Sequence, residues 1–336
     1  MYNYSIIIPH KNIPHLLQRC LNSIPQREDL EVIVVDDDSS PEIVDFNNFP
    51  GKSRNDTTII LDKSGKGGSH ARNIGIEHAK GKWVLFADAD DFYNYCINDI
   101  LNEYVDEDVD IIFFKVNSLN SDDYSTSNRG NDQLNFYIDH YKEDELRYGN
   151  LLKYKCGVHW SKIIRKSVID TNNITYEESI LHNDHRFAYI LGYSSKRIKT
   201  DRRALYCMTT RMNSASKNVS EEALLTRIRI FGEAELFFKK HDIPSYCYWD
   251  WHITQLAELY LSNNNLFPNG CEILLSLGYK QEELNRRLYD PIHWLKIYRK
   301  KRTNIIYRLI NKFRFYFYKL ISFVRLFFRK YPSYVH

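Results

Sequence analysis

The stretch Trp83–Asp91, W-V-L-F-A-D-A-D-D, is an apolar segment that ends in three carboxylates, Asp88, Asp90 and Asp91. A strand that is apolar on both faces is typical of the middle of a parallel sheet covered by helices. Ligands of such sheets bind beyond the carboxyl ends of the strands, where these carboxylates follow. Because Mg²⁺ and similar cations are often held by one or two carboxylates together with substrate phosphates, the pattern predicts a cation-held phosphate site. Taken alone, it fits equally well with Asp88 and Asp91 as caps of a following helix.

Two further apolar runs extend this pattern toward the N-terminus. Glu31–Ser40 reads E-V-I-V-V-D-D-D-S-S and also stops at aspartates, and Tyr4–Pro9 reads Y-S-I-I-I-P. Short apolar strands separated by helical periodicity predict a doubly wound α/β fold, a Rossmann-like, mainly parallel sheet flanked by helices. Further strands are expected at residues 58–61 and 110–116, and helices at residues 16–24 and 71–79.

Five short motifs follow one another along the first part of the chain. They are S-I-I-I-P-H-K-N at Ser5–Asn12, C-L-N-S-I at Cys20–Ile24, V-V-D-D-D-S-S at Val34–Ser40, G-S-H-A-R-N-I-G at Gly68–Gly75 and the acidic run Asp88–Asp91. In this order and spacing they resemble the inverting family-2 glycosyltransferases, which have a GT-A fold. The resemblance is close over residues 4–115 and thinner to about residue 210. It implies the transfer of a sugar from a nucleotide sugar, with a UDP-sugar expected, to a lipid-linked or growing saccharide acceptor in surface polysaccharide synthesis.

The resemblance also implies donor-binding roles for residues that match these motifs. Asp37 is similar to the aspartate that hydrogen-bonds the nucleotide base, and Pro9 would line the same pocket. Arg72 is similar to the arginine beside the pyrophosphate, where a guanidinium suits a planar double contact. Asp88 resembles a ribose or metal ligand, and Asp90 the principal carboxylate on the Mn²⁺ or Mg²⁺ that bridges the donor diphosphate. Without the neighbouring motif, Arg72 would be interpreted as an exposed charge on a helix surface.

The chain departs from the family pattern at Asp38, where Gly is more usual. Asp tolerates a left-handed backbone better than most residues, so the turn is expected to persist. The glycines of K-S-G-K-G-G-S, residues 63–69, do not meet the P-loop pattern. We expect them to form a flexible entry into the helix that carries Arg72.

The expected catalytic base is Asp184, in H-N-D-H-R-F. Family members carry a Glu-Asp pair ahead of an aromatic-containing helix, and here Asn183 replaces the Glu. Inversion requires a base on the face opposite the departing nucleotide, and the transition state has oxocarbenium character. The alternative from the residues alone is an N-cap aspartate. His182 and His185 flank Asp184 and could be its partners or metal ligands.

Trp160 and Asp91 are expected on the acceptor side. The segment Val158–Ser167, V-H-W-S-K-I-I-R-K-S, resembles the family's W-x-K-x-x-R segment near the acceptor. Trp160 could stack on a sugar ring, or it could belong to the core. The polar segment Asn120–Gln133 is expected to be a surface loop, with a lid as one use of it.

The chain is expected to have three parts: a catalytic domain over residues 1–210, a helical appendage over 211–295 and a basic amphipathic helix over 296–336. Beyond Pro291 there is no Asp or Glu, while 12 of the 46 Lys and Arg residues lie there, so the formal net charge of +3 leaves −9 for the rest. A basic helix with an apolar face favours an anionic membrane interface over packing on the catalytic domain, and its charges prevent it from spanning. The acidic remainder argues against nucleic acid as a partner.

The cysteines and the N-terminus favour a cytoplasmic protein at the inner face of the membrane. The six cysteines form no C-x-x-C pair, which predicts reduced, buried thiols and no structural zinc. No signal-peptide pattern precedes the first strand. Two other functions stay open from the residues: a GT-A-like nucleotidyltransferase, which would need a triphosphate site, and a catalytically inert membrane-surface scaffold.

Overall fold

The computed structural model describes residues 2–127, 132–179, 183–211, 220–262 and 264–303. The chain divides into two compact units, of which the first ends at Trp249 and the second begins at Asp250. The helix α8, Glu221–Lys240, therefore belongs to the first unit, whereas we expected a helical appendage to begin at residue 211.

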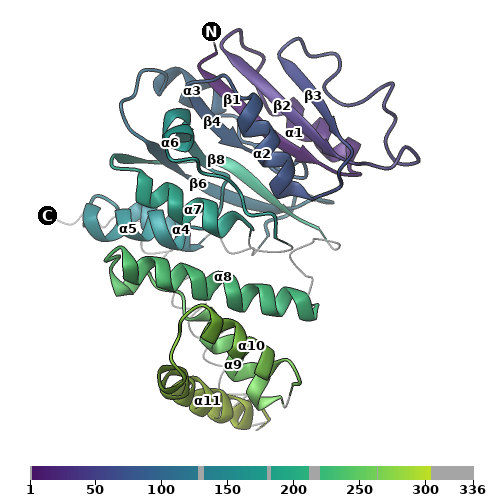
Figure 1. Cartoon of the computed structure of the whole chain (residues 1–336). Coiled ribbons are helices and arrows are strands. Elements are labelled where there is room, and N and C mark those ends of the chain that lie inside the picture. Colours follow the sequence, from purple (N-terminus) through teal and green to yellow (C-terminus); the bar gives the residue numbers. More distant parts are fainter. Residues whose placement is uncertain (1, 128–131, 180–182, 212–219, 263, 304–336) are drawn as a thin grey trace, which may run out of the picture. The chain divides into compact units, whose positions relative to one another are not determined.

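The first unit is built on one sheet with the strand order β3-β2-β1-β4-β7-β6-β8-β5. Figure 1 labels β3, β2, β1, β4, β6 and β8 of this sheet. β1 pairs in parallel with β2 and β4, and β6 pairs in parallel with β8, while β7 runs antiparallel between β4 and β6. The predicted mainly parallel α/β sheet is confirmed. The carboxyl ends of β1, β2, β4, β6 and β8 consequently lie at one edge. The strands are β1 Tyr4–His10, β2 Leu30–Asp37, β3 Thr57–Asp62, β4 Trp83–Phe86, β5 Phe92–Tyr93, β6 Ile111–Asn120, β7 Lys162–Arg165 and β8 Ile198–Thr210.

Helices cover the apolar central strands of the sheet. Every residue of β2 and β4 is buried, as the uninterrupted apolar runs predict. α1 begins with a proline and turns Leu17, Cys20 and Leu21, which share one helical face, toward the core. α2 packs so closely on β1 that a Cβ added at Gly75 would lie 2.3 Å from Ile7 Cγ2. The helices are α1 Pro14–Asn22, α2 Gly68–His78, α3 Ile97–Glu103, α4 Asp132–His140, α5 Glu145–Lys155, α6 Lys166–Thr171, α7 Asn183–Ser194, α8 and the 3₁₀ turn η2 Ser245–Cys247.

The second unit contains three helices in its described part, α9 Trp251–Leu261, α10 Phe267–Ser276 and α11 Gln281–Thr303 (Figure 1). Of the predicted membrane-interface helix over 296–336, residues 296–303 continue α11, and residues 304–336 lie outside the described part of the chain. None of the described helices combines the length and the apolar composition that crossing a membrane requires.

All six cysteines are unpaired thiols. Five of them are buried, as predicted, and Cys271 on α10 is partly buried. The segment expected as a loop over residues 120–133 leaves β6 at Asn120 and enters α4 at Asp132, with residues 121–127 largely exposed. A role as a lid stays a prediction.

Candidate active site

The carboxylate of Asp88, just beyond β4, is held by two basic side chains. Arg72 Nη2 on α2 lies 2.5 Å and His159 Nε2 3.1 Å from Asp88 Oδ1. Burial raises the pKa of Asp88, but His159 and Arg72 outweigh burial and hold this pKa well below its usual range. Asp88 is therefore anionic at neutral pH. Arg72 is buried, so it is not an exposed helix charge.

Asp90 is fixed at both its side chain and its backbone. Its Oδ2 lies 2.8 Å from Nε of Arg211, the residue that follows β8. Its carbonyl oxygen accepts hydrogen bonds from Thr209 Oγ1 at 2.6 Å and from Arg19 Nη2 at 2.5 Å. Burial and the charge of Asp88 raise the pKa of Asp90, although Arg211 opposes this. The side chains of Asp88 and Asp90 remain 28% and 22% exposed, so both are within reach of a ligand.

Asp91, in contrast, is buried and anchors the turn to β8. It accepts hydrogen bonds from the Thr209 backbone N–H at 2.6 Å and from the Tyr206 hydroxyl at 3.0 Å. The same hydroxyl accepts a hydrogen bond from the Asp88 backbone N–H at 2.8 Å. Burial, together with the charges of Asp88 and Asp90, raises the pKa of Asp91 well above its usual value. These contacts are internal, and the acceptor-side position of Asp91 stays a prediction.

Asp88 and Asp91 do not act as caps of the following helix. The next helix, α3, begins only at Ile97 and has Cys96 as its N-cap residue. Neither Asp88 nor Asp91 therefore caps it. The turn is held by β8 and α1 instead.

Pro9 and Asp37 lie at the carboxyl ends of β1 and β2, at the edge expected for a nucleoside. Asp37 accepts hydrogen bonds from the Gly67 backbone N–H at 2.9 Å and from Lys11 Nζ at 3.2 Å. Asp38 has a φ of 53°, so the left-handed turn that we expected to persist at this position is present. The contact with Gly67 brings the end of β2 to the start of α2, the helix that carries Arg72.

Asp184 lies in the first turn of α7 and is partly buried. Its charge acts electrostatically on Arg72, His159 and Lys162, which places it near the cluster around Asp88. The ring of His185 lies 4.8 Å from that of Phe231, and burial lowers the pKa of His185 while the charge of Asp184 opposes this. A role of His185 as a partner of Asp184 or as a metal ligand stays a prediction. His182 lies outside the described residues. The role of Asp184 as a base stays a prediction.

Trp160 stacks on Tyr206, with ring centroids 5.6 Å apart and an interplanar angle of 6°. One face of the indole is thus covered by the protein, and stacking on a sugar stays a prediction for the other. The preceding residue, His159, contacts Asp88. Sequence reasoning missed His159, although it stands inside the segment singled out for Trp160.

Three buried polar atoms around Asp88 have no hydrogen-bond partner within the described structure: Arg72 Nε, His159 Nδ1 and the Tyr176 hydroxyl. The Arg72 guanidinium lies 5.6 Å from the centroid of the Tyr176 ring. Unsatisfied buried polar atoms are rare in native proteins, and several in one place indicate a ligand site. Donors and acceptors together suit a ligand with phosphate or hydroxyl groups.

The carboxylates fit a divalent cation that takes part of its coordination from a substrate. In the part of the chain that the structure describes, no three His, Cys, Asp or Glu side chains are grouped to hold a metal by themselves. Mg²⁺ commonly uses only one or two protein carboxylates, with waters and substrate phosphates as the other ligands. Asp88 and Asp90 can supply those carboxylates.

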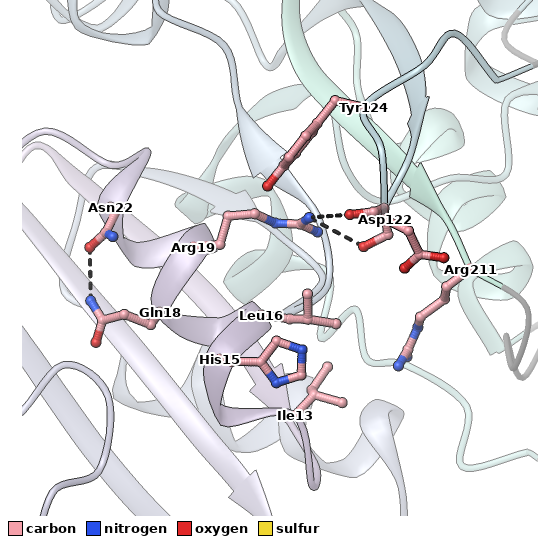
Figure 2. A pocket seen from close by; sticks show the side chains of 10 residues that line it. Ile13, His15, Leu16, Gln18, Arg19, Asn22, Asp122, Tyr124 and Arg211 are labelled. Atoms are coloured by element: carbon pink, nitrogen blue, oxygen red, sulfur yellow. Dashed lines mark hydrogen bonds between the residues drawn. The ribbon is translucent and has the colours of Figure 1, made fainter.

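A cavity of about 700 Å³ opens beside Asp90, between α1 and the segment that follows β6 (Figure 2). Arg211 lines this cavity and also contacts Asp90, so the cavity adjoins the carboxylate. Its lining residues are Ile13, His15, Leu16, Gln18, Arg19, Asn22, Ser121, Asp122, Tyr124 and Arg211.

The chain is similar in sequence to known glycosyltransferases. The family model described as glycosyl transferase family 2 matches residues 5–171. The chain is 26% identical over 254 residues to the uncharacterized glycosyltransferase YibD of Escherichia coli K12. The aligned region covers 71% of this chain and 67% of YibD. It is also 38% identical over 93 residues to the poly(ribitol-phosphate) beta-glucosyltransferase of Bacillus spizizenii, covering 26% of this chain and only 15% of that relative.

Solved structures share the fold. The 1–349 portion of S. aureus TarS, crystallised in complex with UDP-GlcNAc, superimposes with a TM-score of 0.56 at 22% identity, covering 87% of this chain and 79% of TarS. The mannosyltransferase PcManGT from Pyrobaculum calidifontis, in complex with GDP-Man and Mn²⁺, has a TM-score of 0.50 at 14% identity. The match covers 92% of this chain and 83% of PcManGT. The predicted GT-A-like architecture is thereby confirmed.

Proposed function

The chain belongs to glycosyltransferase family 2 and is a glycosyltransferase, and we propose that it transfers a sugar from a nucleoside-diphosphate sugar to a saccharide acceptor in surface-polymer synthesis. The observation that carries this proposal is the cluster at the carboxyl edge of the sheet. There Asp88 and Asp90 stay partly exposed, and Arg72 and His159 present buried polar atoms without partners. A UDP-sugar is the first donor to test because TarS was crystallised with UDP-GlcNAc.

We assign the nucleoside to the side of Pro9 and Asp37 and the diphosphate to the side of Arg72, Asp88 and Asp90. A guanidinium can form two parallel hydrogen bonds to phosphate oxygens, and Arg72 is buried where these bonds would be strong. Asp90 and Asp88 would hold Mn²⁺ or Mg²⁺, and PcManGT, with the same fold, was crystallised with Mn²⁺. When bound, the cation neutralises charge that develops on the departing diphosphate.

Asp184 is the proposed base of an inverting transfer. An acceptor hydroxyl must lose its proton as it attacks the sugar, and a carboxylate in the first turn of α7 can accept that proton. Asp184 interacts electrostatically with Arg72 and Lys162. Trp160 and Asp91 remain the expected acceptor-side residues.

For the acceptor we propose a lipid-linked or growing saccharide at the inner face of the cell membrane. The relative from Bacillus spizizenii is named for poly(ribitol-phosphate), a surface polymer. Residues 296–336, rich in Lys and Arg, would bring the enzyme to anionic lipid as a peripheral protein.

The donor is tested by thermal unfolding against a panel of UDP- and GDP-sugars, with and without Mn²⁺. A ligand at 100 times its dissociation constant stabilises the folded state by about 2.7 kcal/mol, so the correct donor should raise Tm clearly. We expect a UDP-sugar to do so only with the cation. Equal shifts with nucleoside triphosphates would favour the nucleotidyltransferase alternative, and donor binding without turnover would favour the inert scaffold.

A further inference from the structure

The guanidinium of Arg19, on α1, joins three segments that are far apart in the sequence. Nη2 donates to the Asp90 carbonyl oxygen at 2.5 Å and lies 3.4 Å from Thr209 Oγ1. Nη1 donates to Ser121, at 3.2 Å from its Oγ and 3.4 Å from its carbonyl oxygen. One side chain thus ties α1 to the turn after β4, to the end of β6 and to β8.

The partners of Arg19 are all neutral oxygens. Among the described residues no carboxylate oxygen lies within ion-pair distance of its guanidinium. The rings of Phe92 and Tyr124 flank it, with centroids 5.3 and 5.8 Å from Cζ. A planar fork of five donors can serve several segments at once, which the single ammonium of lysine cannot do with the same geometry.

The bond to Asp90 bears on the candidate site because it fixes the backbone of a residue whose carboxylate is partly exposed there. Thr209 Oγ1 donates to the same carbonyl at 2.6 Å, so two donors, from α1 and from β8, set the orientation of this peptide group. The direction in which the Asp90 carboxylate leaves the backbone follows from that orientation. Metal–oxygen distances tolerate deviations of only about 0.2 Å, so this direction affects cation affinity.

We propose that Arg19 is a positioning residue that, through the Asp90 carbonyl, places the Asp90 carboxylate for the divalent cation and the donor diphosphate. This inference rests on the proposed function. Arg19 contacts neither cation nor donor in this assignment. Removing partners that orient metal ligands typically costs roughly 10- to 100-fold in metal affinity.

Arg54 offers a matched control, because it is also an arginine that ties backbone oxygens together. Its Nη1 donates to the carbonyl oxygens of Leu21 at 2.8 Å and Ile24 at 3.0 Å, and it pairs with Asp56. These contacts hold the end of α1 near the amino edge of the sheet, away from Asp90. Loss of Arg54 should therefore affect stability but not the cation.

The experiment titrates Mn²⁺ into the full-length protein saturated with UDP, by calorimetry, and measures donor hydrolysis over a range of Mn²⁺ concentrations. Arg19→Gln should weaken Mn²⁺ binding roughly 10- to 100-fold, and high Mn²⁺ should restore most of kcat. Arg19→Lys should recover part of the affinity. Arg54→Gln should bind Mn²⁺ like the parent, even if its Tm is lower.

Thr209→Val supplies a second variant if Arg19→Gln does not fold. It removes the other side-chain donor to the Asp90 carbonyl, keeps the backbone N–H that binds Asp91, and should weaken Mn²⁺ binding in the same direction. If the folded Arg19 and Thr209 variants bind Mn²⁺ as tightly as the parent, the positioning role of Arg19 is overturned, but the proposed function is not. A parent protein that binds no Mn²⁺ with UDP would overturn the cation in the proposed function, and this inference with it.

Discussion

Asp90 is the residue at which the proposed chemistry is most directly tested. Asp90→Asn keeps the size of the side chain and removes the negative charge that a cation requires, while the bonds to its carbonyl oxygen persist. Donor hydrolysis and transfer should fall by roughly 100-fold or more, and EDTA should do the same to the parent. Asp99→Asn, on the exposed face of α3, is the control and should be fully active. Full activity of the parent in EDTA would remove the cation from the mechanism.

A substitution at Asp184 tests whether this residue acts in the chemical step without binding the donor. Asp184→Asn retains the shape of the side chain but cannot accept a proton, so transfer should fall by roughly 10²- to 10⁴-fold. Affinity for the nucleotide sugar, measured by calorimetry, should change only a few fold, since Arg72 and Asp88 are untouched. If binding and turnover fall together and Tm drops, Asp184 stabilises the first turn of α7 and is not the base.

The candidate site residues that short motifs predict from the sequence lie at strand ends (Pro9, Asp37, Asp88 and Asp90) or on α2 (Arg72), and their roles stay predictions. Those that were missed come together only through the fold. Arg211 lies 121 positions from Asp90 in the sequence, and Arg19 lies 71 positions before it. A single arginine on a helix or after a strand carries no local signal that distinguishes it from a solvated charge. Only the fold places both beside Asp90, Arg211 at its carboxylate and Arg19 at its carbonyl oxygen.

The strand β8 supports the acidic turn, which no motif indicated. The Tyr206 hydroxyl joins the Asp88 backbone to the buried Asp91 carboxylate. Tyr206→Phe keeps the ring that stacks on Trp160 and deletes only this hydroxyl, leaving a buried acceptor with one partner fewer. We expect a loss of about 1–3 kcal/mol in the free energy of unfolding, measured with urea.

Tyr93→Phe is the matched control for Tyr206→Phe. The Tyr93 ring packs on Tyr206, and its hydroxyl makes a 3.2 Å bond to the Phe86 carbonyl, a neutral partner. Its removal should cost only about 1 kcal/mol. Equal losses for the two variants would mean that the bridge through Tyr206 adds nothing to an ordinary buried hydroxyl.

The division of the whole chain was harder to predict than its sheet. Apolar strands and helical periodicity identify the sheet locally, because each run is buried on both faces. The amphipathic pattern of α8 would be the same in a helix of a separate appendage. In the structure, however, Phe238 of α8 packs on Tyr154 of α5 and Tyr189 of α7. Which unit a helix joins depends on such partners, and these cannot be read from its own periodicity.

We expect burial to protect five of the six cysteines from thiol reagents in the folded protein. Burial raises the pKa of Cys156 and of Cys247 to about 12 and that of Cys207 to about 11. Since the thiolate is the reactive form, these groups should be inert near pH 8. We expect at most one thiol, Cys271, to react rapidly in the native protein, and six after denaturation. Rapid reaction of several thiols would show that the first unit opens easily.

The last prediction concerns what the C-terminal residues do for the whole protein. Every candidate site residue precedes residue 212, while seven Lys and Arg residues and no acidic residue follow Thr303. Each Lys or Arg near an anionic surface contributes about 1 kcal/mol of attraction, so a protein ending at Thr303 should lose binding to anionic vesicles in a sedimentation assay. Its affinity for the donor should match that of the full chain.

Charge reversal in the full chain separates this attraction from packing. Replacing Arg308, Lys312 and Lys319 by Glu adds repulsion while leaving the apolar residues of this segment in place. Vesicle binding should then weaken sharply, and what remains should depend less on salt, because fewer attractive charges are left to screen. Neutral vesicles serve as the control and should bind neither protein strongly. If the protein ending at Thr303 instead aggregates or melts well below the parent, these residues stabilise the fold, and the membrane assignment fails.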